Sequence, residues 1–525
     1  MRHSCCFLSL LPALILSSPL RAGVTIITHG LNGSVDDWII PMAERIPDYP
    51  TFPGTTFSCY EIFFVPNGAG GFNVSHQWLA GVMPSQSDSG QILIKLDWSQ
   101  LANNNYSTDE VAEWIAPRLW DPLFMPDLNG RSLASWPIHL LGHSRGGSIV
   151  SELSRHLGQQ GIWVDHVTTW DPHPLNNDGF DDSLFYSVVD ATVTTYENVL
   201  FADNYYQLLS SFTYGEPIFG AYVRRLTNLS GGYTDFLDIS GSHSDVHLWY
   251  HGTIELGTPA SDTGATIAST QRQNWWTPSE QQGAQAGFLY SRIGGGDRLS
   301  FAQPANASAI RDGMNQQWDF GAGFSDNRTP LPSNLGLWPN LIQLDLFGSS
   351  SVEIESPIQL RGHYQYGQDA AQSFTLSFHL DPDLNPLNGN ELPVGRVNRS
   401  GTGTESVIRE DWSLPTSGLG LAAGTYRVLG VIADAVHDRF MYAPDLLTLT
   451  AAQEPPRLVL LGWSENGLGV VVQGDSGQTI RLDAASELNA WAPLATNTLT
   501  GTTWEYQDAE ALAQARRFYR AVRLP

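Results

Sequence analysis

The chain is poor in cysteine. It has three cysteines among 525 residues, and two of them, Cys5 and Cys6, lie in a short apolar stretch that follows a positively charged start. This pattern is typical of a secretory signal peptide, which we expect over residues 1–22 with cleavage near Ala22. Its removal leaves only Cys59, which excludes an intramolecular disulfide in the mature protein. We therefore expect a secreted protein, extracellular or periplasmic, that does not depend on disulfides.

Basic residues and long apolar runs are also scarce. The chain has 27 Lys and Arg against 53 Asp and Glu, which gives a formal net charge of −26. So acidic a protein repels phosphate backbones, and nucleic acid is not an expected partner. No apolar run is long enough to cross a bilayer, so we expect no transmembrane span.

The hydrophobic pattern of the sequence changes near residue 335. Up to about residue 335, short apolar runs alternate with helix-like segments, which predicts an α/β domain over 23–335 with a mostly parallel sheet. The expected strands are 24–28, 56–65, 92–98, 138–141, 166–170 and 198–202, and the expected helices are 107–120 and 148–158. Later segments alternate in hydrophobicity between Gly and Pro turns. They predict an Ig-like β-sandwich over 336–452 and a small β-rich module over 453–525.

The most informative segment is Gly142-His143-Ser144-Arg145-Gly146. An apolar run precedes it and a helix-like segment follows, and this order of strand, Gly-x-Ser-x-Gly and helix is the context of a nucleophile elbow. The turn at Ser144 is so sharp that only small residues fit two positions away on either side, where Gly142 and Gly146 stand. The segment therefore predicts Ser144 as a catalytic nucleophile.

A serine nucleophile needs donors for an oxyanion. The pair His29-Gly30 directly follows the first expected strand, and glycine there lets the backbone turn its N–H groups toward the serine. We expect the backbone amides of Leu31 and Arg145 to form the oxyanion hole. Because these roles belong to the backbone, we expect both side chains to be almost free to vary.

The general base has three candidates, His243, His247 and His251, which are four residues apart. On a helix they would share a face, but the segment lacks the glutamate of a His-Glu-x-x-His zinc motif. Ser244-Asp245 resembles a helix N-cap, which would leave His243 on the loop before the helix, where it could reach the serine. We favour His243 as the base, with His247 as the alternative.

The acid has two candidates. Asp171 lies 27 residues after Ser144 at the end of the next expected strand, and Asp203 lies at the end of the strand after that. Either residue gives the chain order serine, acid, histidine that α/β-hydrolases use. The residues alone leave this choice open.

Several motifs in the same order resemble the pancreatic-lipase family. They are Thr28-His29-Gly30-Leu31 with Asp37-Trp38, Lys95-Leu96-Asp97-Trp98, the Gly-x-Ser-x-Gly segment, Val167-Thr168-Thr169-Trp170-Asp171-Pro172, and Ser242-His243 with Trp249-Tyr250. The resemblance spans roughly residues 24–254. It implies an α/β-hydrolase fold and places the acid at Asp171 rather than Asp203. The family's lid cysteines are absent, so its lid is not implied here.

These observations predict a lipase-like or esterase-like serine hydrolase that cleaves carboxylic esters through an acyl-enzyme, with a small-molecule or lipid ester as substrate. An acyltransferase or peptidase could use the same residues, and a catalytically inactive surface-binding protein is the alternative from another class. The β modules would serve attachment, to a surface or a lipid interface, or stability. We expect no required cofactor.

Two acidic segments are candidates for structural Ca²⁺, because alternating oxygen ligands suit that ion. They comprise Asp178, Asp181 and Asp182, and Asp381, Asp383 and Asn385. We favour a solvated loop for the first. In the second, Pro386 stands where an EF-hand loop has glycine.

Overall fold

The computed structural model describes residues 22–31, 33–48, 56–87, 89–102, 106–179, 181–210, 213–227, 229, 231–233, 241–255, 267–276, 287–290, 328–331, 338–367, 370–401, 403, 407–451 and 454–524. The predicted signal peptide, apart from Ala22, and both predicted domain boundaries lie outside these residues. The chain divides into two compact units. The first comprises Met1–Ser350, Pro357–Leu419 and Thr425–Thr448, and the second Ser351–Ser356, Gly420–Gly424 and Leu449–Pro525.

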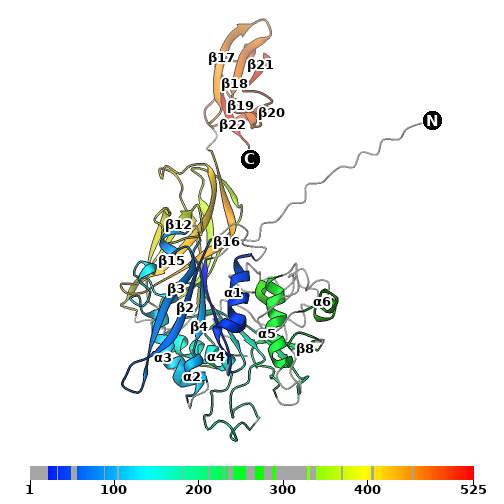
Figure 1. Ribbon diagram of the computed structural model, residues 1–525. Helices are drawn as coiled ribbons and strands as arrows, with labels where there is room; N and C mark the ends of the chain where they lie inside the picture. Colours follow the sequence, from blue (N-terminus) through cyan, green and yellow to red (C-terminus); the bar gives the residue numbers. More distant parts are fainter. Residues whose placement is uncertain are drawn as a thin grey trace, which may run out of the picture. The chain divides into compact units, whose positions relative to one another are not determined.

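A sheet of eight strands forms the N-terminal part of the first unit (Figure 1). Its strands are β1 Gly23–Thr28, β2 Phe57–Pro66, β3 Phe72–Gly81, β4 Gln91–Asp97, β5 Ile138–His143, β6 Val164–Trp170, β7 Val199–Gln207 and β8 Tyr222–Leu226. They lie in the order β3-β2-β4-β1-β5-β6-β7-β8, and every neighbouring pair is parallel except β2 and β3. The predicted mostly parallel sheet is confirmed.

Helices cover both faces of this sheet. They are α1 Ile40–Arg45, α2 Ser99–Ala102, α3 Thr108–Trp120, α4 Arg145–Gln159, α5 Gly241–Ile254 and α6 Ser269–Trp275. Side chains of α3 and α4 are buried with Ile26 and Ile94, and those of α1 and α5 with Ile27 and Leu93. Successive strand residues point to opposite faces, so a sheet covered on both faces needs continuous apolar strands. This is why these strands are apolar runs in the sequence.

The edge strand β3 was not predicted. It lies in the segment from Pro66 to Ser89, which is rich in Gly, Ser and Asn. The Asn67 side chain closes a turn by accepting hydrogen bonds from the amides of Ala69 and Gly71, at 2.9 and 3.0 Å. The chain then returns antiparallel to β2. β3 is largely exposed, and an edge strand with one solvated face lacks the apolar signal of its buried neighbours.

Two antiparallel sheets follow in the first unit. One contains β9 Asn340–Leu346, β11 Ile358–Gln365 and β14 Val407–Leu414, and the other contains β12 Ser373–Asp381, β13 Leu392–Ser400, β15 Gly424–Ala433 and β16 Asp438–Thr450. The sheets face each other, since the rings of Phe378 and Trp412 lie 4.8 Å apart. The predicted change from an α/β part to a part built of antiparallel strands is confirmed.

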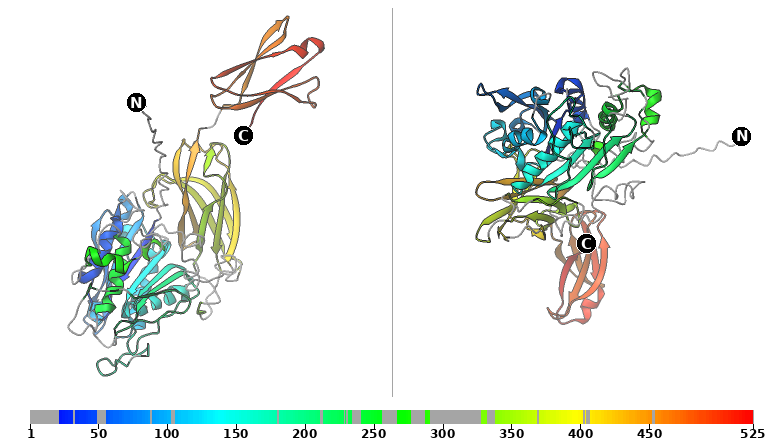
Figure 2. Two further views of the ribbon diagram at one scale, coloured as in Figure 1. Left: turned by 90° about the vertical axis from the view of Figure 1, so that its right-hand side faces the viewer. Right: turned by 90° about the horizontal axis from the view of Figure 1, so that it is seen from below.

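The antiparallel sheets pack against the amino ends of the parallel strands. Trp136, just before β5, contacts Phe440 of β16 with ring centroids 4.9 Å apart. Near the start of β6, Asp165 accepts a hydrogen bond from Arg439 Nη2 at 3.2 Å. These contacts join both parts into one core, and Figure 2 shows the sheets beside the α/β part of the same unit.

The second unit has its own core. Its strands are β10 Ser351–Glu353, β17 Arg457–Ser464, β18 Gly467–Gln473, β19 Thr479–Ala485, β20 Ala492–Thr498, β21 Thr503–Asp508 and β22 Phe518–Arg523. The sheets β17-β18-β21 and β20-β19-β22 bury Val470, Val472, Ile480 and Leu482. Within the described part of the chain, no helix combines the length and the apolar character needed to cross a bilayer.

Candidate active site

Ser144 occupies a strained turn between β5 and α4. Its φ of 56° and ψ of −126° lie in a region that residues with a side chain rarely adopt, at a cost of about 1–3 kcal/mol. Glycines make the turn possible, because a Cβ on Gly142 would lie 2.2 Å from the backbone oxygen of Gly146. Gly30, on the loop after β1, also has no room for a side chain, because a Cβ added there would lie 2.5 Å from Ser144 Cβ. The loop after β1 therefore lies directly against the serine, as the oxyanion-hole hypothesis requires.

Asp171 and His243 are in direct contact. His243 Nδ1 lies 2.7 Å from Asp171 Oδ2. The carboxylate is fully buried and accepts three further hydrogen bonds. They come from the backbone and side-chain nitrogens of Gln207, at 2.9 and 2.8 Å, and from the amide of Gly215, at 2.9 Å. Asp171 is thus fixed in place. Its contact with Nδ1 orients the imidazole and leaves Nε2 available for proton transfer.

His143 holds His243 beside the elbow. Its Nε2 donates a hydrogen bond to the backbone oxygen of His243 at 3.0 Å, and the two rings lie 4.5 Å apart. Burial, together with the nearby His243 and His247, lowers the pKa of His143 well below its usual range. A neutral His143 keeps one N–H for this contact. Because His143 immediately precedes Ser144, the contact ties the start of α5 to the residue before the serine.

His243 lies in the first turn of α5, which begins at Gly241. The expectation that Ser244-Asp245 caps the helix and leaves His243 on a loop is therefore wrong. The Asp245 carboxylate does accept a backbone hydrogen bond, but from the amide of Tyr233 at 2.8 Å. The capping pattern was misleading because this acceptor serves the preceding segment rather than the helix start.

Asp203, the alternative acid, lies in a different environment. Its Oδ1 contacts His166 Nε2 at 2.8 Å and the Thr168 hydroxyl at 2.6 Å, and its Oδ2 accepts from the Tyr205 hydroxyl at 2.9 Å. Burial raises its pKa to about 7. The structure brings Asp171, and not Asp203, to His243.

The other two histidines lie further along α5. The His247 ring stacks on Trp38 at 4.2 Å and meets the edge of His143 at 4.7 Å. His251 Nε2 lies 3.8 Å from a carboxylate oxygen of Glu255. Neither contacts Asp171, so the geometry singles out His243.

The side chain of Arg145 is not free to vary, contrary to expectation. It is fully buried and forms a two-pronged ion pair with Asp190, with Nε to Oδ2 at 2.6 Å and Nη2 to Oδ1 at 2.7 Å. It also donates to the backbone oxygens of Ala102 and Tyr106, at 2.7 and 2.8 Å. The residue whose backbone amide we assign to the oxyanion hole is thereby anchored to two neighbouring segments.

Several residues that shape the site carry no readable signal in the sequence. Gln207 and Gly215 hold Asp171, and Asp190 both pairs with Arg145 and accepts from the amides of Thr108 and Leu175, at 3.0 and 2.9 Å. Each acts across a large sequence separation. Only the fold shows which buried polar group it serves.

The calcium candidates are engaged in contacts with protein groups. Asp178 contacts the imidazole of His173, Asp182 Oδ2 lies 3.8 Å from the same ring, and Asp181 is exposed. In the second segment, donors of the chain occupy the oxygens. Asp381 Oδ1, Asp383 Oδ1 and Asn385 Oδ1 accept from backbone amides at 2.9, 2.8 and 2.9 Å, and Asp383 Oδ2 accepts from the side-chain amides of Asn388 and Asn390, each at 2.8 Å. Structural calcium stays a prediction for both segments.

Within the described residues, one group has metal-ligand spacing, namely Asp109, Glu152 and His156. Arg155 lies between its carboxylates, in contact with Asp109 and with its Nε 2.5 Å from Glu152 Oε2. A guanidinium already neutralises these oxygens, so we read the group as an ion-pair network.

No family model and no curated protein matches the chain. Among solved structures, the C-terminal domain of wzt is 12% identical, with 21% of this chain and 73% of that chain covered and a TM-score of 0.17. Red sea bream transglutaminase is 9% identical over 42% of this chain and 32% of that one, with a TM-score of 0.16. The human OSCAR ligand-binding domain is 17% identical over 34% and 87%, with a TM-score of 0.14. These TM-scores are too low to indicate a shared fold.

Proposed function

We propose that the chain is a serine hydrolase that cleaves carboxylic esters, with Ser144 as nucleophile, His243 as base and Asp171 as the orienting acid. The observation that carries the proposal is the 2.7 Å contact between His243 Nδ1 and Asp171 Oδ2, beside a serine held at positive φ. A buried carboxylate that fixes one imidazole nitrogen leaves the other for proton transfer with the serine. On this proposal the first sheet and its helices are an α/β-hydrolase fold, and the facing antiparallel sheets are an Ig-like β-sandwich.

The mechanism follows from these positions. Ser144 Oγ attacks the ester carbonyl while His243 Nε2 takes its proton, and the same nitrogen then returns the proton to the leaving alcohol. The amides of Leu31 and Arg145 hold the oxyanion, and the start of α4 adds a favourable helix dipole. Water then releases the acid from the acyl-enzyme by the reverse sequence. The Asp171 carboxylate stabilises the imidazolium that forms at each step.

On this proposal the protein is secreted, and its substrate is a small-molecule or lipid ester. The chemistry needs no metal or organic cofactor, because serine, imidazole and backbone amides supply nucleophile, base and oxyanion donors. An acyltransferase or a peptidase would use the same residues, so release of a free acid from an ester is the reaction to measure.

The test compares the two candidate acids. Hydrolysis of p-nitrophenyl butyrate is measured for the wild type, Asp171→Asn and Asp203→Asn. We expect Asp171→Asn to lower kcat by about 10⁴-fold, because the amide favours the wrong imidazole tautomer. Asp203→Asn, the matched control, should stay within a few-fold of the wild type. Equal losses in both variants, or none in Asp171→Asn, would overturn the assignment.

A further inference from the structure

The second unit contains a cavity that takes no part in the proposed ester chemistry. Its volume is about 500 Å³, and residues from β19, β20, β21 and the chain between β21 and β22 line it. This volume falls within the range of small-molecule sites, about 300–1,000 Å³. Small side chains such as Ala484, Ala490 and Ala492 line part of it and leave room for an occupant.

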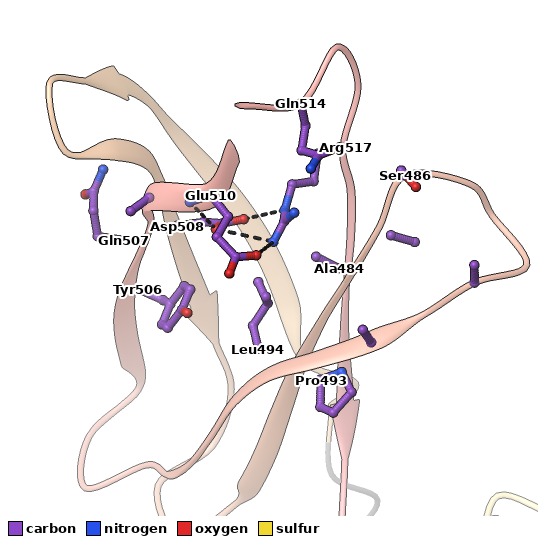
Figure 3. A pocket seen from close by; sticks show the side chains of 14 residues that line it. Ala484, Ser486, Pro493, Leu494, Tyr506, Gln507, Asp508, Glu510, Gln514 and Arg517 are labelled. Atoms are coloured by element: carbon purple, nitrogen blue, oxygen red, sulfur yellow. Dashed lines mark hydrogen bonds and ion pairs between the residues drawn. The ribbon is translucent and has the colours of Figure 1, made fainter. Parts of the chain in front are cut away.

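A fixed ion pair lies in this cavity. Arg517 Nε lies 2.6 Å from Asp508 Oδ2, and Arg517 Nη2 lies 3.3 Å from Glu510 Oε2. Asp508 is almost completely buried and also accepts a hydrogen bond from the Tyr519 hydroxyl at 2.8 Å. Figure 3 shows Arg517 directed at both carboxylates. The cavity therefore presents hydrogen-bond donors and acceptors side by side.

This charge arrangement disfavours an anionic occupant. An anion would face two carboxylates, and the whole chain, at a net charge of −26, repels it further. A hydroxyl group suits the site, because it accepts from Arg517 and donates to Glu510 at the same time.

An apolar surface adjoins the polar groups. The Tyr506 ring, Leu494 and Pro493 are part of the lining, together with the alanine methyl groups. Figure 3 shows Tyr506 and Leu494 next to the Asp508–Arg517 pair. A sugar ring carries hydroxyl groups at its rim and an apolar C–H face, so it matches both parts of the cavity.

We propose that this cavity binds a neutral saccharide, which would make the second unit a carbohydrate-binding module. The inference is independent of the proposed hydrolase, because none of its residues belongs to the candidate active site. The unit's own core adjoins the cavity. The core residue Ala511 directly follows Glu510 of the lining, and the core residue Leu482 lies in β19, as do Ala484 and Ala485 of the lining.

The experiment uses the full chain and a panel of hexasaccharides, namely cellohexaose, maltohexaose, chitohexaose and the acidic hexagalacturonate, in isothermal titration calorimetry. Ala490→Trp fills the cavity from an exposed lining position, and Ala515→Trp places the same ring at an exposed position outside the lining. Melting curves establish that both variants fold.

We expect at least one neutral hexasaccharide to bind, Ala490→Trp to weaken it at least tenfold, and Ala515→Trp to leave it unchanged. Hydrolysis of p-nitrophenyl butyrate should be unaltered in both variants, so failure of this proposal and failure of the hydrolase proposal are distinguishable. The proposal is overturned if no neutral hexasaccharide binds, if the acidic one binds more tightly, or if both variants behave alike.

Discussion

A buried Arg–Asp ion pair lies at each end of the strands of the central sheet, and the two pairs have different structural roles. At the carboxyl edge, Arg145 follows the elbow and pairs with Asp190, and at the amino edge, Asp165 pairs with Arg439 of the neighbouring antiparallel sheet. All four side chains are almost completely buried. The partners, however, differ in what surrounds them.

The carboxyl edge carries strained backbone, whereas the amino edge carries apolar contact. Ser144 and Asp171 have φ values of 56° and 41°. At the amino edge Trp136 packs on Phe440. Strain persists only where the surroundings over-determine it. The comparison indicates that the Arg145–Asp190 pair holds the strained site in shape, while the Arg439–Asp165 pair joins two layers.

Removing each arginine should separate these two roles. In Arg145→Ala and Arg439→Ala an unpaired carboxylate stays buried, so each should lower the free energy of unfolding by about 3–5 kcal/mol. Only Arg145→Ala should also lower kcat, by up to about 100-fold, because the elbow and its neighbouring segments shift. Urea unfolding and p-nitrophenyl butyrate kinetics at a temperature where both variants are folded measure the two effects.

Arg118→Ala is the control. This half-buried arginine lies 3.8 Å from Asp121, the residue after α3, and its loss should change both quantities far less. The comparison would fail if Arg439→Ala lowered kcat as much as Arg145→Ala.

A pH-dependent effect on stability is expected from Asp203, a buried carboxylate of β7. Asp203 bonds to His166, Thr168 and Tyr205, and burial raises its pKa from 3.8 to about 7. Between about pH 4 and pH 7 the folded state therefore binds a proton that the unfolded state has released. The free energy of unfolding should fall as pH rises through this window.

Asp203→Asn removes that titration, so its unfolding free energy should fall less between pH 4.5 and pH 7.5 than that of the wild type. Urea titrations at several pH values, on both proteins, provide the measurement. Parallel pH profiles would show that Asp203 does not titrate in this window.

Local signals in the sequence were sufficient to predict the turn at Ser144 and several elements of the fold. The glycines around Ser144 indicate a turn that only small neighbours permit. The helix predicted over 107–120 is α3, which begins with a capping box formed by Ser107 and Glu110. The apolar runs predicted six of the eight strands of the central sheet, because strands covered on both faces must be apolar throughout. Each of these signals acts within a few residues.

Partner choice among buried polar groups could not be predicted in the same way. His243 and Asp171 are 72 residues apart, and Gln207 reaches Asp171 across 36 residues. Nothing at position 190 distinguishes the aspartate that holds Arg145 from the many aspartates of an acidic chain. Such pairings depend on which strands lie side by side, and that is decided by packing of the whole unit.

The most direct test of the account is covalent labelling of Ser144 by a fluorophosphonate probe, which reacts with a serine only when a base and an oxyanion site activate it. The wild type should be labelled, with the adduct mapped to the peptide that contains Ser144, and folded Ser144→Ala should not be labelled. Absence of labelling in the wild type, or undiminished labelling of Ser144→Ala, would contradict the assignment of Ser144 as the nucleophile.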